Sequence, residues 1–148
     1  MSSLVAFNKG MGVQMAGDTV ACGYIHNCTI VSNNSTGVHF DYGYTSYDIR
    51  NSIIWGNTGD AGVTCENTGI GLTLGNNVIG GKTVAVKWTN GSCWSIGGNQ
   101  FADPLLDGNC VPTEGSPAVK AGRNLRNYPL AAELRACGLR PLLVNASD

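Results

Sequence analysis

The feature that most constrains the fold of this chain is a short segment that recurs at a fixed interval. A Gly-Val pair occurs at positions 12, 37 and 62, at a constant spacing of 25 residues. An asparagine precedes each pair, and a second asparagine column recurs at positions 27, 51 and 76. A period of this length indicates an array of similar structural units stacked on one another.

The repeated units are expected to be short β-strands. Residues 25–31, 49–55 and 74–80 align with one another, are rich in β-branched residues and are bounded by Asn and Gly corners. The helical spacing of apolar residues is absent through residue 90. Each strand would then pair with its copy about 4.8 Å away, in a parallel sheet whose asparagine amides form ladders. The column glycines would serve corners that need a positive φ or a close approach.

The composition of the chain limits the kinds of partner that it is expected to bind. The 148 residues fit one domain, and a hydrophobic content of 43% argues against disorder. With 13% charged residues and a net charge of −1, neither nucleic acid nor an anionic membrane surface is expected as a partner. No apolar run approaches the length of a membrane span. The start of the sequence has no signal peptide, so we expect a mature or trimmed segment or a cytoplasmic protein.

Two kinds of segment carry a resemblance to a known fold family. Residues 27–33 (Asn-Cys-Thr-Ile-Val-Ser-Asn) and 51–57 resemble coils of the right-handed parallel β-helix, or pectate-lyase-like, superfamily. Residues 101–106 and 115–122 (Gly-Ser-Pro-Ala-Val-Lys-Ala-Gly) resemble the last coil and closing segment of bacterial extracellular members. The resemblance implies an all-β parallel β-helix of about four to five coils at an extracellular or cell-surface location. It implies no single activity, since the superfamily includes lyases, hydrolases, epimerases and phage tailspikes.

One domain is expected over residues 1–148. We expect coils over 4–106, a closing segment over 107–128, a capping helix over 129–138 and a tail over 139–148. The helix is predicted from a proline near its start, good helix formers and a final glycine. The few residues before the first coil are too short to cap it. Its open strands are therefore expected to pair with a second copy of the chain, or with further coils of a longer protein.

Strand alternation predicts a polar strip on the outer face of one sheet. The valine of each Gly-Val pair and the apolar residue two positions later are expected to point inward, so the intervening residues point outward. The strip then carries His39, Asp41 and Glu66 as candidate catalytic residues, with Gln14 and Thr64 as substrate-binding neighbours. The two stacked carboxylates would repel each other or recruit a cation such as Ca²⁺, and histidine could transfer a proton. We expect no other metal or cofactor.

A tyrosine-rich segment follows the strip. Tyr42, Tyr44 and Tyr47 are candidates for stacking on sugar rings, or alternatively for packing over the edge of the coil. His26 is expected to be a surface or corner residue. A uronate lyase would also need a basic residue from outside the strip, for which Arg50, Lys82 and Lys87 are the candidates.

The six cysteines match no zinc-binding pattern. Cys28 and Cys65 are expected to be free and buried, because they lie within the regular repeat. A disulfide is more plausible among Cys93, Cys110 and Cys137, which lie outside it.

Three functions remain open on the sequence. The favoured prediction is a carbohydrate- or surface-binding module without catalysis, with a polysaccharide as partner. The second is a polysaccharide lyase or glycoside hydrolase that acts along the outer sheet through the strip. The third is a structural unit that associates with itself through its first coil. The polarity of the strip is also explained without any function, if its residues are outward side chains of the sheet that are exposed to solvent.

Overall fold

The computed structural model describes residues 3–16, 22–41, 46–66, 71–89 and 92–122, and every structural statement below concerns these residues. Within them the chain is all-β, and its strands form three four-stranded sheets. None of these residues forms a helix that is long and apolar enough to cross a membrane.

The three sheets are built from strands that follow one another in a fixed cycle. Sheet A contains β1 (Ser3–Ala6), β4 (Cys28–Val31), β7 (Ile53–Trp55) and β10 (Val78–Ile79). Sheet B contains β2 (Val13–Met15), β5 (Val38–Phe40), β8 (Ala61–Cys65) and β11 (Val84–Trp88). Sheet C contains β3 (Cys22–His26), β6 (Ser46–Arg50), β9 (Gly71–Gly75) and β12 (Ser92–Ser95).

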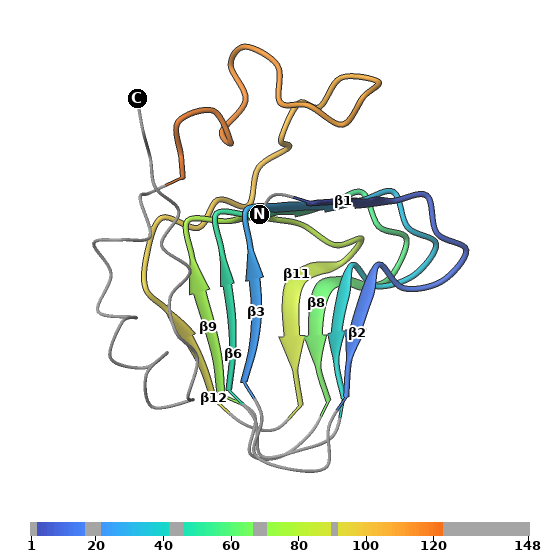
Figure 1. Cartoon of the computed structure of the whole chain (residues 1–148), viewed down its shortest axis with the longest axis vertical. Coiled ribbons are helices and arrows are strands. Elements are labelled where there is room, and N and C mark those ends of the chain that lie inside the picture. The colour runs from blue at the N-terminus through green and yellow to red at the C-terminus, as the bar shows by residue number, and fades with distance from the viewer. Residues whose placement is uncertain (1–2, 17–21, 42–45, 67–70, 90–91, 123–148) are drawn as a thin grey trace.

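All strand pairs within the three sheets are parallel, and each strand pairs with its own copy one repeat later. Val38, for example, pairs with Val13 on one side and Val63 on the other. Figure 1 shows sheets B and C as facing walls, with β1 of sheet A running across one end of both. The prediction of an all-β chain with parallel sheets is confirmed. The expected helix over 129–138 and tail over 139–148 lie outside the described residues.

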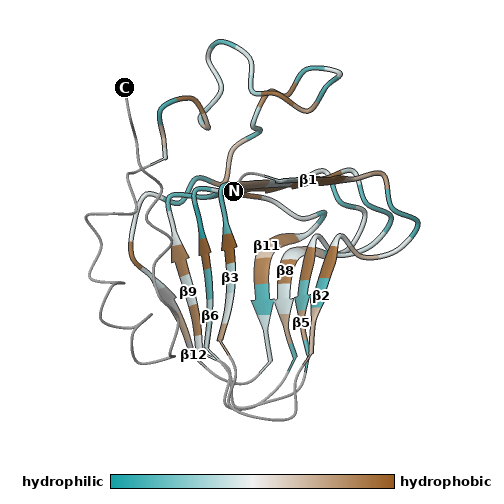
Figure 2. Cartoon of the chain, viewed as in Figure 1, coloured by the Kyte–Doolittle hydropathy of each residue, from teal (hydrophilic) through white to brown (hydrophobic). Residues whose placement is uncertain are grey.

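The interior between the sheets is filled by the inward side chains of each strand. Val38, Phe40 and Val63 have no exposed surface, as the alternation predicted. Figure 2 shows hydrophobic and hydrophilic residues next to each other along β2 and β5 of sheet B. Tyr47 is 5% exposed and stacks on Phe40 with ring centroids 4.1 Å apart, so its predicted role in sugar stacking is wrong. The reason is alternation on β6, where Tyr47 and Ile49 both point into the core.

Buried asparagine amides connect successive repeats at the corner between sheets A and B. The Oδ1 atom of Asn33 accepts hydrogen bonds from the backbone N (3.1 Å) and Nδ2 (2.9 Å) of Asn8. The Oδ1 atom of Asn57 accepts the same two bonds from Asn33, at 3.0 and 2.9 Å. The predicted ladder of Asn8, Asn33 and Asn57 is therefore confirmed. It satisfies backbone groups that the corner would otherwise bury unpaired.

The segment after β12 lies against the outer face of sheet A. Leu106, Cys110 and Ala118 pack on a cluster formed by Val31, Ile53 and Val78. In Figure 1 this segment is drawn in orange, beyond sheet A from sheets B and C. The apolar outer face of sheet A is thus covered. The outer faces of sheets B and C, in contrast, carry polar side chains.

The cysteines agree only in part with the prediction. Cys28 and Cys65 are free thiols, as expected. Cys93 and Cys110 are also free, so a disulfide at either is wrong, because each packs against an apolar cluster. Cys22 is disulfide-bonded. Cys137 lies outside the described residues.

Candidate functional site

The outer face of sheet B brings together three members of the predicted strip. The backbone N atoms of Asp41 and Glu66 donate to the carbonyl oxygens of Met15 and Phe40, which continues the register of the strands by one residue. Asp41 and Glu66 are therefore consecutive members of one column. The side chain of Gln14, on β2, donates from Nε2 to Oδ2 of Asp41 at 3.4 Å. Gln14 and Glu66 are exposed and Asp41 is half-buried.

His39 and Thr64 differ from the prediction of an exposed strip. They are only 8% and 6% exposed. Their side chains bond to each other, with His39 Nδ1 2.5 Å from Thr64 Oγ1. The physical reason is that β5 is an internal strand of sheet B, so side chains of β2 and β8 flank His39 on both sides. The exposed part of the strip is reduced to Gln14, Asp41 and Glu66.

Metal binding at this strip would rest on two carboxylates. In the described ranges, no three His, Cys, Asp or Glu side chains gather as a metal site would require. Calcium at Asp41 and Glu66 remains a prediction, for which an oxygen-rich ligand such as a sugar would have to complete the coordination. Tyr42 and Tyr44 lie outside the described residues.

A hydrogen-bonded group on the outer face of sheet C was not predicted. The carboxylate of Asp48, on β6, accepts from Arg50 Nε at Oδ1 and lies beside His26 Nε2 at Oδ2, both at 2.7 Å. Asp48 and Arg50 are 6% and 3% exposed. Burying an ionic group is costly unless it is paired. Here Asp48 is paired with Arg50 on the same strand and with His26 on the adjacent strand β3. The ring of Tyr24 approaches His26 edge-on, at 5.7 Å and 63°.

The sequence did contain a signal for this group. Ile25 and Ile49 occupy one inward column, so their neighbours His26, Asp48 and Arg50 had to point outward together. The contact between His26 and Asp48 could not be predicted from the strand register, because in the register His26 pairs with Arg50 and Asp48 pairs with Tyr24. The bond between His26 and Asp48 is therefore diagonal, which long side chains on adjacent strands can bridge.

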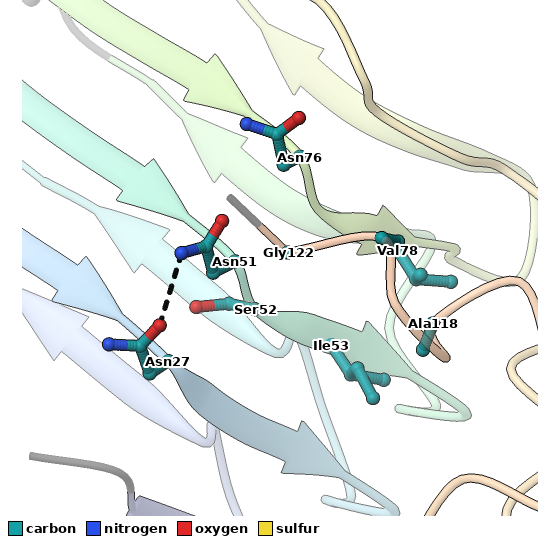
Figure 3. Close-up of a pocket in the computed structure, with 9 residues that line it drawn as sticks. Asn27, Asn51, Ser52, Ile53, Asn76, Val78, Ala118 and Gly122 are labelled. Atoms are coloured by element: carbon teal, nitrogen blue, oxygen red, sulfur yellow. Dashed lines mark hydrogen bonds between the residues drawn. The ribbon is translucent and has the colours of Figure 1, made fainter. Parts of the chain in front are cut away.

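A pocket of about 360 Å³ lies between the corner of sheets C and A and the segment that covers sheet A. Asn27, Asn51 and Asn76 form its polar wall, and Ala118 and Gly122 lie opposite (Figure 3). The three asparagines have φ values of 55°, 52° and 53°, a conformation that asparagine tolerates better than most residues. No charged side chain lines this pocket among the described residues, so it offers hydrogen bonds but no acid or base.

No protein-family model, curated protein or solved structure matches this chain.

Proposed function

We propose that this chain is a right-handed parallel β-helix module that binds a neutral polysaccharide along the outer face of sheet B without cleaving it. The fold proposal is supported by three parallel sheets visited in a constant cycle, with each strand paired to its copy one repeat later. Parallel connections of this kind are almost always right-handed. The closing segment and the asparagine ladder are consistent with it.

The observation that carries the binding proposal is the group of outward side chains formed by Gln14, Asp41 and Glu66 on sheet B. Asp41 and Glu66 are consecutive in one column, and Gln14 lies in the neighbouring column and bonds to Asp41. Strands in a sheet are about 4.8 Å apart, so Asp41 and Glu66 present two acceptor groups about one strand spacing apart along the stack. The side chain of Gln14 donates to one carboxylate oxygen of Asp41. A carboxylate can accept several hydrogen bonds. Carboxylate and amide groups arranged in this way match the hydroxyl groups of a sugar chain.

The negative charge of the strip favours a neutral ligand over an acidic one. Asp41 and Glu66 are consecutive in the column, and the described residues of the strip include no cation. A uronic-acid polymer would place its own carboxylates against these two and be repelled. Such a polymer is expected to bind only if Ca²⁺ bridges the two sets of carboxylates.

The geometry gives no support to cleavage at the strip. The Nδ1 atom of His39 is bonded to Thr64, and the ring is 8% exposed. An acid or base must reach the proton that it transfers. Glycoside hydrolysis would also require one of the two carboxylates to act as a general acid opposite the other across the bond, whereas these two stand side by side on one face.

The proposal is tested by affinity measurements on variants that keep the shape of the strip. Asp41→Asn and Glu66→Gln each replace an acceptor-only carboxylate with an amide. Each is expected to weaken binding to neutral oligosaccharides about tenfold, measured by isothermal titration calorimetry after a glycan array has identified the best neutral chain. Asp60→Asn is the matched control, because Asp60 is exposed but lies outside the strip.

Three results would contradict the proposal. The first is an array on which no neutral glycan binds, and the second is equal affinity in the strip variants and the control. The third is release of reducing ends from the bound glycan, which would restore the lyase or hydrolase alternative. Binding of uronate polymers only in the presence of Ca²⁺ would instead move the ligand class to acidic chains and assign the cation to Asp41 and Glu66.

A second candidate function is self-association, which one observation favours. Within the described chain, β1, β2 and β3 each pair on one side only and lie at the same end of their sheets. Phe7 and Met11, between β1 and β2, are 71% and 37% exposed. Unpaired strand edges beside apolar side chains favour pairing with another chain. We propose a second copy of this chain as the partner.

A further inference from the structure

His26 is held in one orientation on the outer face of sheet C. The Asp48 carboxylate is fixed at Oδ1 by Arg50, a permanent cation, and its Oδ2 atom lies 2.7 Å from His26 Nε2. A carboxylate accepts hydrogen bonds, so we assign the ring proton of neutral His26 to Nε2. The lone pair is then on Nδ1, for which the described residues provide no hydrogen-bond partner.

The two histidines of the chain differ in what their ring nitrogens can reach. The Nδ1 atom of His39 is occupied by Thr64, and His39 is buried. The side chain of His26 is 20% exposed, more than that of Asp48 at 8% or Arg50 at 4%. The imidazole of His26 therefore has an oriented basic nitrogen, a buried carboxylate behind it and partial access to solvent. This is the arrangement by which carboxylates prepare histidines for proton transfer.

The residues around His26 limit the reaction that it could serve. Glycoside hydrolysis requires two carboxyl groups, and Asp48 is the only Asp or Glu in the four strands of sheet C. Elimination at a uronate requires a cation for the substrate carboxylate, whereas Arg50 is buried and bonded to Asp48. Hydrolysis of an acyl ester needs a base that activates water, which His26 can supply.

We propose that His26 is the general base of a second site, on the outer face of sheet C, that hydrolyses small acyl esters. Nδ1 takes a proton from water while the water oxygen forms a bond to the ester carbonyl carbon. The tetrahedral intermediate then breaks its bond to the alcohol oxygen, which receives that proton from Nδ1. The products are the acid and the alcohol, and Asp48 is a positioning residue that stabilises the imidazolium between the two steps. This proposal does not depend on glycan binding at sheet B.

The test uses the full chain and p-nitrophenyl acetate, with release of p-nitrophenolate followed between about pH 5 and 9. The rate constant per protein is expected to exceed that of free imidazole by about a hundredfold, with a solvent deuterium isotope effect that marks proton transfer by a base. His26→Gln is expected to remove this excess. Asp48→Asn is expected to lower kcat and to leave KM nearly unchanged, because the carboxylate orients the ring of His26 and does not itself contact the ester.

His39→Gln is the matched control, because it removes the other imidazole of the chain and is expected to keep the excess rate. Circular dichroism tests whether each variant is folded. If Asp48→Asn does not fold, the proposal is tested by His26→Gln alone. The proposal is overturned if the folded protein reacts no faster than the same concentration of imidazole. It is equally overturned if folded His26→Gln retains the rate of the unaltered chain.

Discussion

Asparagine occupies two kinds of position in this chain, and the physical reason differs between them. Asn27, Asn51 and Asn76 have positive φ values at a corner, so there the backbone conformation favours asparagine. Asn33 and Asn57 are buried, and there the amide itself is needed because it bonds to backbone groups of neighbouring repeats. The same residue type therefore recurs at the period of the fold for separate reasons.

Asn33 is the residue at which loss of the amide should cost most. Its side chain is fully buried, accepts two bonds from Asn8 and donates to Val5 O and Asn57 Oδ1. Asn33→Ala leaves several of these groups unpaired and is expected to lower the free energy of unfolding by about 3 kcal/mol, measured by urea denaturation. The exposed neighbour Asn34 is the control, because Asn34→Ala should change stability by less than about 0.5 kcal/mol. Equal losses in the two variants would contradict the account of the ladder.

The thiol of Cys65 predicts a dependence of stability on alkaline pH. Burial, with a smaller effect from the charge of Cys93, raises the pKa of Cys65 from 9.0 to about 12. The folded chain therefore favours the neutral thiol, and this stabilisation is complete below pH 9 and is lost as the pH rises toward 12. The free energy of unfolding should fall less steeply with pH above 9 in Cys65→Ala than in the unaltered chain. Parallel pH profiles would show that the thiol is not buried as described.

At the scale of elements, the repeat period predicts which residues share a column but not how much solvent reaches them. The inward columns follow from alternation and in-register parallel pairing, because a one-residue shift would place the apolar side chains in solvent. The burial of His39 does not follow in this way, since it depends on the side chains of two flanking strands. The contact between His26 and Asp48 is also hidden in a linear alignment, because it is diagonal to the register.

The Gly-Val pair shows how an element depends on close approach. At Gly37 a Cβ atom would lie 2.5 Å from Ile54 Cγ2 and 2.6 Å from Asn57 Nδ2, which is too close for an alanine. The sequence left two reasons for a glycine at this corner, a positive φ or a close approach of neighbouring atoms. Close approach is the reason at Gly37, since Gly37 is not among the residues with positive φ. Gly37→Ala is therefore expected to lower the free energy of unfolding by about 2 kcal/mol, measured by urea denaturation.

The control for this substitution is Gly10→Ala, because no atom other than those of Gly10 and its two chain neighbours lies within 4 Å of the position of its Cβ. It should leave stability nearly unchanged. If Gly37→Ala were as stable as Gly10→Ala, the atoms around Gly37 would have to be packed less closely than the structure shows.

At the scale of the whole molecule, the two ends of the strand stack differ. At one end β1, β2 and β3 have unpaired edges in the described chain. At the other end, β11 and β12 also pair on one side only in the described chain, whereas Gln100 continues sheet A by a parallel bridge to Val78 and the following segment turns back over the outer face of that sheet. Association through the edges of all three sheets at once is therefore expected at the first end.

Self-association predicts a dimer mass in sedimentation equilibrium. Phe7→Asn should shift the chain toward the monomer, because it removes an exposed ring at the first end while asparagine tolerates the φ of 61° at this position. Phe101→Asn is the control, since Phe101 is 64% exposed but lies at the opposite end. A strict monomer, or dissociation caused equally by both substitutions, would contradict pairing through β1, β2 and β3.

The central claim is that the outer face of sheet B is the surface that contacts carbohydrate. Its most direct test is a map of backbone amide chemical shifts during titration with the neutral oligosaccharide that the array selects. The largest changes are expected at Gln14, Asp41 and Glu66, with little change along β3 and β6 of sheet C. Changes concentrated at Asn27 and Asn51 would instead place the ligand in the corner pocket and contradict the claim.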